Sequence, residues 1–129
     1  MKKVIGIIAE YNPFHNGHIY QIKKIKEKYP ESIIIVCTSS SYTQRGELSI
    51  LNKWEKTKVA LLHGVDIVIE LPYVYSTQSS DTFAKYSVSL LEKLYIDYLC
   101  FGSECNDTNK LKEAAQVQIN NIDFDIKVK

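Results

Sequence analysis

Arginine is almost absent from this sequence, because Arg45 is the one arginine among 16 lysine and arginine residues in a chain of 129. Recognition of phosphate by a cluster of arginines is therefore excluded. The formal net charge is only +1, and the lysines form no basic block. The sequence thus lacks the obvious electrostatic footprint of a nucleic-acid-binding surface.

Cysteine is scarce, and long apolar runs are missing. The three cysteines, Cys37, Cys100 and Cys105, form no C-x-x-C pair, which favours free thiols over a disulfide framework or a zinc site. An apolar stretch of only six residues precedes Glu10, too short for the apolar region of a signal peptide. No run approaches the roughly 20 residues of a membrane span. We therefore expect a cytoplasmic protein that does not enter a membrane.

Short apolar runs alternate regularly with segments of helical periodicity. The predicted strands cover residues 4–8, 32–37, 66–70 and 97–101. The predicted helices cover residues 15–29, 51–63, 80–94 and 108–117. Strands separated by such helices indicate βαβ units, and the sequence therefore predicts an α/β fold, a three-layer α/β/α sandwich with a parallel sheet.

The spacing of side chains also predicts which face of the first helix is buried and supports the second helix. In the first helix, the inner stripe comprises Ile19, Ile22, Ile25 and Lys26. In the second helix, the residues near helical spacing are Trp54, Lys58, Leu61 and Leu62. Gly64 is placed to end that second helix.

The loop after the first strand carries two histidines, His15 and His18, around Asn16 and Gly17. Residues three apart lie on the same side of a helical turn. A first turn also offers unpaired main-chain N–H groups and the positive end of the helix dipole, which attract phosphate and favour neutral imidazole rings. Gly17 has no side chain to keep a ligand from the backbone. This loop therefore predicts a nucleotide phosphate site at the ligand-binding edge of the sheet.

The histidine pair has two other interpretations. A histidine at this position can simply cap the helix. Alternatively, Glu10 could join His15 and His18 in a zinc site, but no further cluster of ligands supports it. We therefore predict no metal site.

Three further loops at the same predicted edge hold polar or small residues. Arg45 suits a phosphate or carboxylate group, or it forms a surface ion pair with Glu47 or Glu55. The tyrosines of the third loop either pack beneath it or line a pocket for a base. Gly102 could let adenine or ribose lie against the backbone, although a plain turn requires the same residue.

The H-x-G-H pattern after a first strand resembles the HIGH-type nucleotidylyltransferase superfamily, which includes adenylyltransferases and class I aminoacyl-tRNA synthetases. A longer string is more specific: E-Y-N-P-F-H-N-G-H at 10–18, Q-R-G-E at 44–47, K-W at 53–54, G-V-D at 64–66 and E-L-P at 70–72. This string is similar to the bacterial tRNA(Met) cytidine acetate ligase family. The resemblance runs from residue 4 to about residue 104.

The resemblance implies a Rossmann-like fold of the HUP type and a ligase that uses ATP and acetate. Such an enzyme forms acetyl-adenylate and acetylates N4 of the wobble cytidine in elongator tRNA(Met). His15 and His18 would be catalytic and hold the phosphates, with Mg²⁺ expected on the triphosphate. The residues implied to bind ATP are Ile8, Ala9, Glu10, Tyr11, Asn12, Pro13, Phe14, His15, Asn16, Gly17, His18 and Gly102, with Arg45 as a further phosphate or substrate contact.

The sequence departs from the family pattern in two respects. Ser40 and Ser41 stand where the family's second loop has Gly-Asn. Family members are also longer, with a second phosphate-binding element resembling I-S-x-T-x-x-R and a helical region for tRNA, neither of which is found after Gly102. We therefore expect residues 1–118 to form an incomplete nucleotidylyltransferase-like ATP-binding domain and residues 119–129 to be a tail that begins a truncated segment.

An incomplete domain of this kind is expected to bind ATP but to have weak or no ligase activity alone. Its contacts with tRNA would lie mostly in regions that this chain lacks. Two other functions remain open. One is a small-molecule nucleotidylyltransferase, which a product with a new phosphoanhydride would indicate. The other is a non-catalytic nucleotide-binding module, which would bind ATP without exchanging pyrophosphate.

Overall fold

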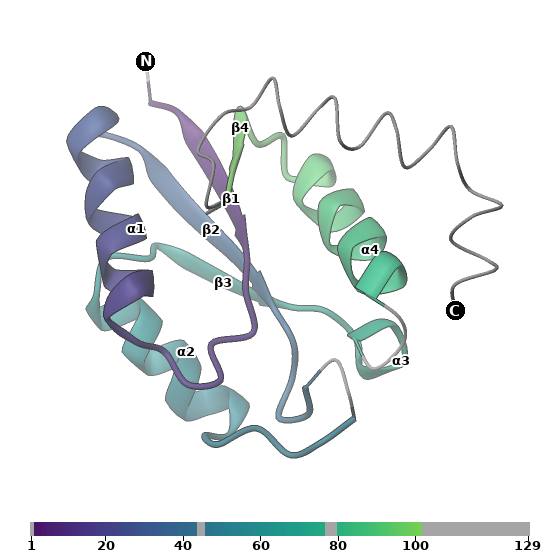
Figure 1. Ribbon diagram of the computed structural model, residues 1–129. Helices are drawn as coiled ribbons and strands as arrows, with labels where there is room; N and C mark the ends of the chain where they lie inside the picture. Colours follow the sequence, from purple (N-terminus) through teal and green to yellow (C-terminus); the bar gives the residue numbers. More distant parts are fainter. Residues whose placement is uncertain (1, 44–45, 77–79, 102–129) are drawn as a thin grey trace, which may run out of the picture.

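Figure 1 shows the computed structural model of the chain, which describes residues 2–43, 46–76 and 80–101. In these residues strands alternate with helices, and two helices stand between the last two strands. The elements follow one another as β1 (Val4–Ile8), α1 (Asn16–Lys28), β2 (Ile33–Thr38), α2 (Lys53–Leu62), β3 (Ile67–Glu70), α3 (Tyr73–Ser76), α4 (Ser80–Lys93) and β4 (Tyr98–Cys100).

The strands form one parallel sheet in the order β3-β2-β1-β4. Ile5 of β1 lies opposite Ile34 of β2 on one side and Tyr98 of β4 on the other. The chain therefore builds the sheet outward from β1 to β3 and then crosses back to add β4 on the opposite side of β1. The carboxyl end of β1 thus lies at the switch point of the topology, where parallel sheets open a crevice for ligands.

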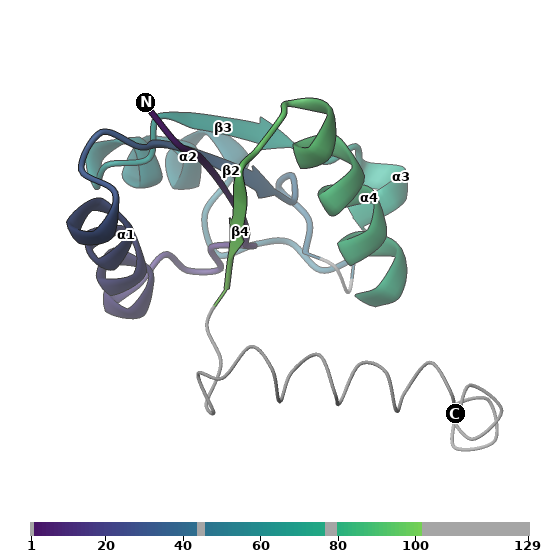
Figure 2. The ribbon, with the colours of Figure 1, turned by 90° about the horizontal axis from the view of Figure 1, so that it is seen from above.

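Helices cover both faces of the sheet, with α1 and α2 on one side and α4 on the other (Figure 2). Side chains of β2 alternate between the two layers because successive residues of a strand point to opposite faces. Ile34 and Val36 join the buried cluster of α1 and α2, whereas Ile35 and Cys37 join the cluster that contains residues of α4. The predicted three-layer sandwich with a parallel sheet is therefore confirmed.

Gly6 in the middle of β1 allows α4 and the connection to β4 to approach the sheet closely. A Cβ atom at this position would lie 2.9 Å from Cδ1 of Ile96 and 3.1 Å from Cδ1 of Leu91. Leu91 belongs to the buried core on that face, and the partly buried Ile96 packs against it. The glycine thus sets the distance between β1 and the layer that covers it.

The observed boundaries differ from the predicted ones by a few residues. β2 covers Ile33–Thr38 rather than 32–37, and α2 begins at Lys53 after Asn52, whose Oδ1 accepts the N–H of Glu55 at 2.9 Å. The short helix α3 was not predicted, because four residues are too few to show a period. The predicted helix 108–117 and the tail after it lie outside the described residues.

The residues of α2 that lie near helical spacing are not the ones that it buries. The buried residues of this helix are Lys56 and Ala60. The structure leaves exposed all four residues noted for their spacing: Trp54, Lys58, Leu61 and Leu62. In α1, by contrast, Ile22 and Ile25 are buried as predicted. No helix in the described part of the chain has the length and apolar character needed to cross a membrane.

Candidate functional site

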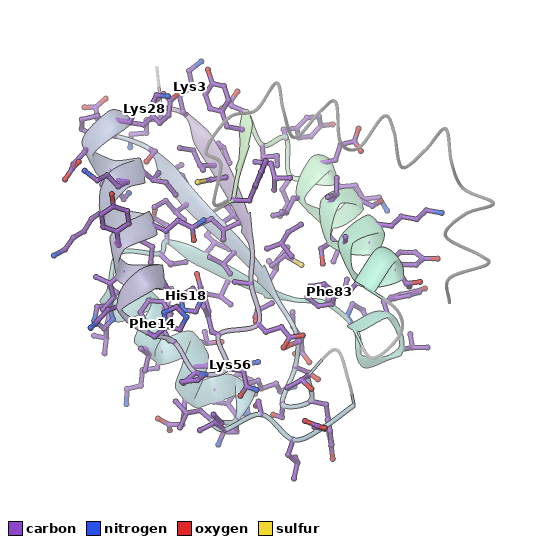
Figure 3. All side chains as sticks on the ribbon, viewed as in Figure 1. Lys3, Phe14, His18, Lys28, Lys56 and Phe83 are labelled. Atoms are coloured by element: carbon purple, nitrogen blue, oxygen red, sulfur yellow. The ribbon has the colours of Figure 1, made fainter. Side chains whose placement is uncertain are left out.

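The two histidines lie at the carboxyl end of β1, where the chain turns into α1. Their rings stack, with centroids 3.8 Å apart and an interplanar angle of 24°. His15 is exposed and is the N-cap of α1, while His18 is partly buried in its first turn. Figure 3 shows His18 beside Phe14 at this end of the sheet. The predicted shared face of His15 and His18 is therefore present.

Hydrogen bonds fix the orientation of both imidazole rings. Nδ1 of His15 accepts the main-chain N–H of Gly17 at 3.1 Å. Nδ1 of His18 accepts the main-chain N–H of His15, also at 3.1 Å. Because each Nδ1 accepts a hydrogen bond, it carries no proton in the neutral ring, whose proton is therefore on Nε2. This assignment leaves two Nε2–H groups as donors on adjacent stacked rings.

The environment of His18 favours its neutral form. Burial lowers the pKa of His18 below its usual range, and the nearby His15 lowers it further. The cause is therefore desolvation first and repulsion between the two rings second, whereas the sequence had suggested the helix terminus. A neutral His18 donates from Nε2 while Nδ1 holds the loop.

The first turn of α1 uses its main-chain donors differently from the prediction. The N–H groups of Gly17, His18 and Ile19 all donate to His15, the first to its ring and the others to its carbonyl. A Cβ atom on Gly17 would lie 2.9 Å from Cε1 of His15. Gly17 therefore makes room for the His15 ring, and the imidazole Nε2–H groups replace these three amides as candidate phosphate donors.

Aromatic side chains hold His18 from the other side. The ring of Tyr11 lies 4.7 Å from the His18 ring and 4.8 Å from the Phe14 ring, in edge-on contacts. Phe14 in turn contacts His18 and His63, with centroids 5.4 and 5.2 Å away. Tyr11 is only 2% exposed and belongs to the buried core. His18 is thus anchored to the core by the aromatic residues that precede it.

The loop is anchored at two further points, one through its main chain and one through a side chain. The carbonyl of Glu10 accepts hydrogen bonds from Nζ of Lys56 at 3.0 Å and from Oγ1 of Thr38 at 3.3 Å. Oδ1 of Asn12 accepts the main-chain N–H of Ile50 at 2.7 Å. Between these anchors Tyr11 has a φ of 51°, and the Asn12–Pro13 peptide is cis.

The other described residues of the implied ATP site belong to this loop or end the strand before it. Ile8 ends β1, and the N–H of Ala9 donates to the carbonyl of Cys37 at 3.1 Å. Pro13 and Asn16 are exposed. Gly102 and Arg45 lie outside the described residues, so their contacts with a ligand, and an ion pair of Arg45, stay predictions.

The alternative of a zinc site at Glu10 finds no geometric support. Within the described residues, no group of three or more His, Cys, Asp or Glu side chains is placed to hold a metal ion. The alternative of a helix cap is correct for His15, which fills that position. Capping and phosphate binding use different ring nitrogens, so the two roles are compatible.

The described residues of the second loop pair with one another across the loop. Tyr42 and Leu48 form an antiparallel bridge, and the N–H of Thr43 donates to the carbonyl of Glu47 at 2.7 Å. Ser39 and Ser40 at the end of β2 are buried. In the third loop, Tyr75 packs against the α4 core cluster and stacks on Tyr86, as predicted for a packing role.

Lys56 is the functional candidate that the sequence analysis missed. Its side chain is 1% exposed, and its Nζ reaches both the carbonyl of Glu10 and, at 3.3 Å, Oγ of Ser39. Burial lowers the pKa of Lys56, while Glu10 and Glu70 act in the opposite direction. The sequence feature that could have indicated the burial of Lys56 is its spacing of four residues from Ala60, the other buried residue of this helix.

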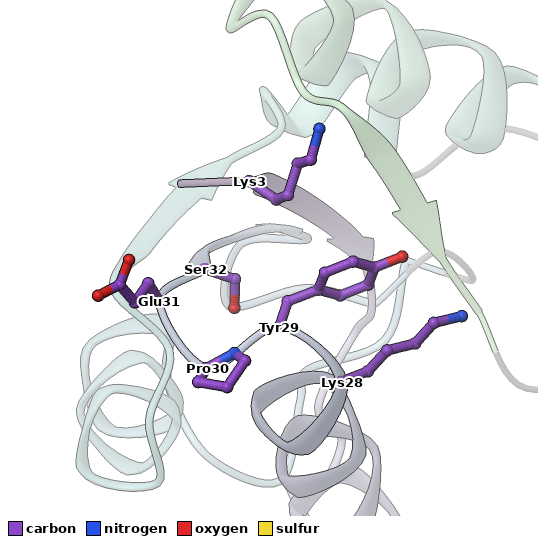
Figure 4. A pocket seen from close by; sticks show the side chains of 6 residues that line it. All are labelled: Lys3, Lys28, Tyr29, Pro30, Glu31 and Ser32. Atoms are coloured by element: carbon purple, nitrogen blue, oxygen red, sulfur yellow. The ribbon is translucent and has the colours of Figure 1, made fainter. Parts of the chain in front are cut away.

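A surface pocket of about 510 Å³ lies at the opposite end of the sheet (Figure 4). Lys3 precedes β1 and Ser32 precedes β2, so the pocket opens at the amino ends of the strands. The whole length of β1 separates it from the histidine pair. The pocket is therefore not part of this site; its lining residues are Lys3, Lys28, Tyr29, Pro30, Glu31 and Ser32.

Known proteins share both the sequence and the fold. A tRNA(Met) cytidine acetate ligase of Fusobacterium nucleatum is 53% identical over 118 residues, which cover 92% of this chain and 30% of that protein. One from Clostridium kluyveri is 54% identical over 110 residues, covering 84% and 27%. The solved structure of Thermotoga maritima TmcAL bound with alpha-thio ATP matches with a TM-score of 0.82 and 39% identity, over 89% of this chain and 28% of that one.

The chain thus spans less than a third of the length of the curated relatives that it matches. The family described as HIGH Nucleotidyl Transferase matches residues 1–129. The parallel sheet, with the H-x-G-H loop at its switch point, agrees with the fold implied by the sequence resemblance. The chain therefore belongs to the HIGH nucleotidyl transferase family.

Proposed function

We propose that this chain binds ATP through the loop of residues 8–18 and is the nucleotide-binding part of a ligase that acetylates tRNA. The observation that carries the proposal is the stacked pair of His15 and His18, with both Nδ1 atoms accepting main-chain N–H groups. The pair lies where parallel sheets bind ligands. The alpha-thio ATP in the similar solved structure supports ATP as the nucleotide, and the names of the relatives support an acetate ligase that acts on tRNA.

The proposed reaction has two steps. An oxygen of acetate attacks the α-phosphorus of ATP, the bond from that phosphorus to the bridging oxygen breaks, and pyrophosphate leaves. The resulting acetyl-adenylate then gives its acetyl group to N4 of the wobble cytidine in elongator tRNA(Met), while N4 loses a proton and AMP leaves. In this reaction the substrate is the magnesium complex of ATP. A tRNA substrate is in turn consistent with a location in the cytoplasm.

His15 and His18 would act on the first step as hydrogen-bond donors. Negative charge grows on the oxygen that leaves with pyrophosphate, and donors already oriented toward it stabilise that charge without reorganisation. Two adjacent Nε2–H groups on rings held by the loop and by Tyr11 and Phe14 meet this requirement. The rings donate hydrogen bonds here and do not need to transfer a proton.

Calorimetry with ATP tests the nucleotide site. We expect the chain to bind ATP, and we expect His15→Ala and His18→Ala to weaken binding. Lys23→Ala removes an exposed positive charge from the same helix and serves as the matched control, with binding close to that of the wild type. Absence of ATP binding, or equal binding by all variants, would contradict the proposal.

Pyrophosphate exchange tests the reaction class. Exchange that depends on acetate would support formation of acetyl-adenylate. Exchange that depends instead on a phosphorylated small molecule, with a dinucleotide product detected by mass spectrometry, would contradict the acetate ligase and support a small-molecule nucleotidylyltransferase.

A further inference from the structure

The buried ammonium group of Lys56 is unusual for a lysine. Lysine is rarely fully buried, because its charge loses hydration that must be replaced by other contacts. Lys56 is nevertheless among the largest fully buried side chains in the described residues. Figure 3 shows it at the same end of the sheet as His18 and Phe14. Because burial of this charge is costly, its position beside the candidate site indicates that Lys56 has a role in that site.

Lys56 joins three parts of the molecule. The side chain extends from α2, and its Nζ donates to the carbonyl of Glu10 at 3.0 Å and to Oγ of Ser39 at 3.3 Å. Glu10 belongs to the loop after β1, and Ser39 directly follows β2. Oγ1 of Thr38 donates to the same Glu10 carbonyl. Two donors from neighbouring elements thus fix one carbonyl oxygen of the loop.

The position of the Glu10 carbonyl constrains the backbone of Tyr11, the next residue. Tyr11 has a φ of 51°, in the left-handed region that a bulky side chain rarely adopts. Such a conformation persists only where the surrounding structure holds it. The Tyr11 ring then lies 4.7 Å from the ring of His18. A fixed Glu10 carbonyl therefore leads directly, through Tyr11, to the placement of His18.

We propose that Lys56 is a positioning residue for the nucleotide loop. Its ammonium group holds the Glu10 carbonyl, keeps Tyr11 in its left-handed conformation and so orients His18. Lys56 is too deeply buried to touch a ligand and acts through the loop. The part of this inference that concerns ATP rests on the proposed function, whereas the part that concerns the His18 ring does not.

Three variants of the 129-residue chain test this role. Lys56→Met keeps the apolar length and removes the charge and the donors. Lys56→Arg keeps both the charge and the donors. Lys58→Met makes the same change of charge two residues away at an exposed position and serves as the control. Imidazole resonances of His18, assigned by comparison with His18→Gln, and ATP affinity are measured well below the melting temperature of each variant.

We expect Lys56→Met to shift the His18 resonances and to weaken ATP binding by about tenfold or more, the effect of one poorly placed hydrogen bond. In Lys56→Arg the His18 resonances and the ATP affinity should lie closer to those of the wild type than in Lys56→Met. In Lys58→Met both should match the wild type. Unchanged His18 resonances in Lys56→Met, or equal effects of Lys56→Arg and Lys56→Met, would overturn the proposal.

The test also covers two other cases, an unfolded Lys56→Met variant and a wild-type chain that does not bind ATP. If circular dichroism shows that Lys56→Met is unfolded, Thr38→Val replaces it, because it removes the other donor to the Glu10 carbonyl without changing charge. A shift of the His18 resonances then supports the fixed carbonyl, and wild-type resonances overturn it. If the wild-type chain does not bind ATP, the proposed function fails, and the His18 resonances still decide the role of Lys56.

Discussion

Replacing His15 by asparagine should separate the two roles of this residue. His15 caps α1 through Nδ1, which accepts the N–H of Gly17 at 3.1 Å, and the proposal assigns Nε2–H to a phosphate. Asparagine is among the strongest N-cap residues, so Oδ1 of the variant can take over the cap. It cannot present a second donor stacked on His18. The variant should therefore keep its stability and lose affinity for ATP.

The two variants at His15 differ in which hydrogen bonds they remove, and this difference sets the expected magnitudes. A hydrogen bond to a charged group contributes about 1.5–3 kcal/mol, so His15→Asn should weaken ATP binding by about 10- to 150-fold. Its melting temperature should stay within about 1 °C of the wild type, because the cap is kept. His15→Ala loses the cap as well, which costs about 1 kcal/mol and lowers the melting temperature by about 4 °C in a chain of this size.

Calorimetric titration with ATP and thermal unfolding followed by circular dichroism measure the two effects on the same samples. The reasoning is refuted if His15→Asn binds ATP as tightly as the wild type. It is equally refuted if His15→Ala and His15→Asn unfold at the same temperature, because the N-cap would then contribute nothing.

Three other changes test neighbouring parts of the structure. Gly17→Ala places a Cβ 2.9 Å from Cε1 of His15, so it should displace that ring and weaken ATP binding in calorimetry as much as His15→Asn does; wild-type affinity would contradict this reason for the glycine. Burial and then His15 lower the pKa of His18 from 6.5, so below about pH 6.5 the unfolded chain binds more protons than the folded chain. The melting temperature should therefore fall as pH is lowered from about 7.5 to 5, and fall less in His18→Gln; equal pH dependence in both would exclude His18 as the cause. Burial raises the pKa of the Cys37 thiol, which is fully buried, so a thiol reagent followed by mass spectrometry should modify Cys37 in urea and spare it in the folded chain. Modification at equal rates in both would contradict the burial.

The layers of the fold could be predicted because the apolar runs are continuous. Ile34 and Ile35 are neighbours on opposite faces of β2, and both are buried. Such a run indicates a strand covered on two sides, which requires helices in both outer layers. The parallel order of the sheet follows from the intervening helices. The order of its strands was not predicted, because it depends on contacts between distant parts of the chain.

The phase of α2 could not be predicted from apolar spacing. Trp54 and Leu62 are 73% and 76% exposed, whereas Lys56 is buried through hydrogen bonds to Glu10 and Ser39. A hydropathy pattern treats every lysine as an exposed residue. The face of a helix that holds a lysine buried by tertiary hydrogen bonds is therefore not recognised as the buried face.

Within the site, likewise, the features set by local geometry could be predicted from the sequence, and those set by long-range contacts could not. The spacing of three residues correctly predicted that His15 and His18 face the same way, since local geometry alone decides it. Which nitrogen of each ring accepts a hydrogen bond depends on the path of the loop before the helix. That path, through the left-handed Tyr11, is set by contacts with β2 and α2, which are distant in sequence.

The central position of β1 has a consequence for synthesis of the chain. One edge of β1 pairs with β2 soon after both strands are made, but its other edge pairs with β4, and the N–H of Val4 donates to Oδ2 of Asp97, 93 residues later. Pairing across so long a stretch is slow, because the loop must close before the contacts form. During translation, the edge of β1 that pairs with β4 therefore stays unpaired until β4 has left the ribosome. The switch point beside the histidines is thus completed by the last of the described strands to be translated.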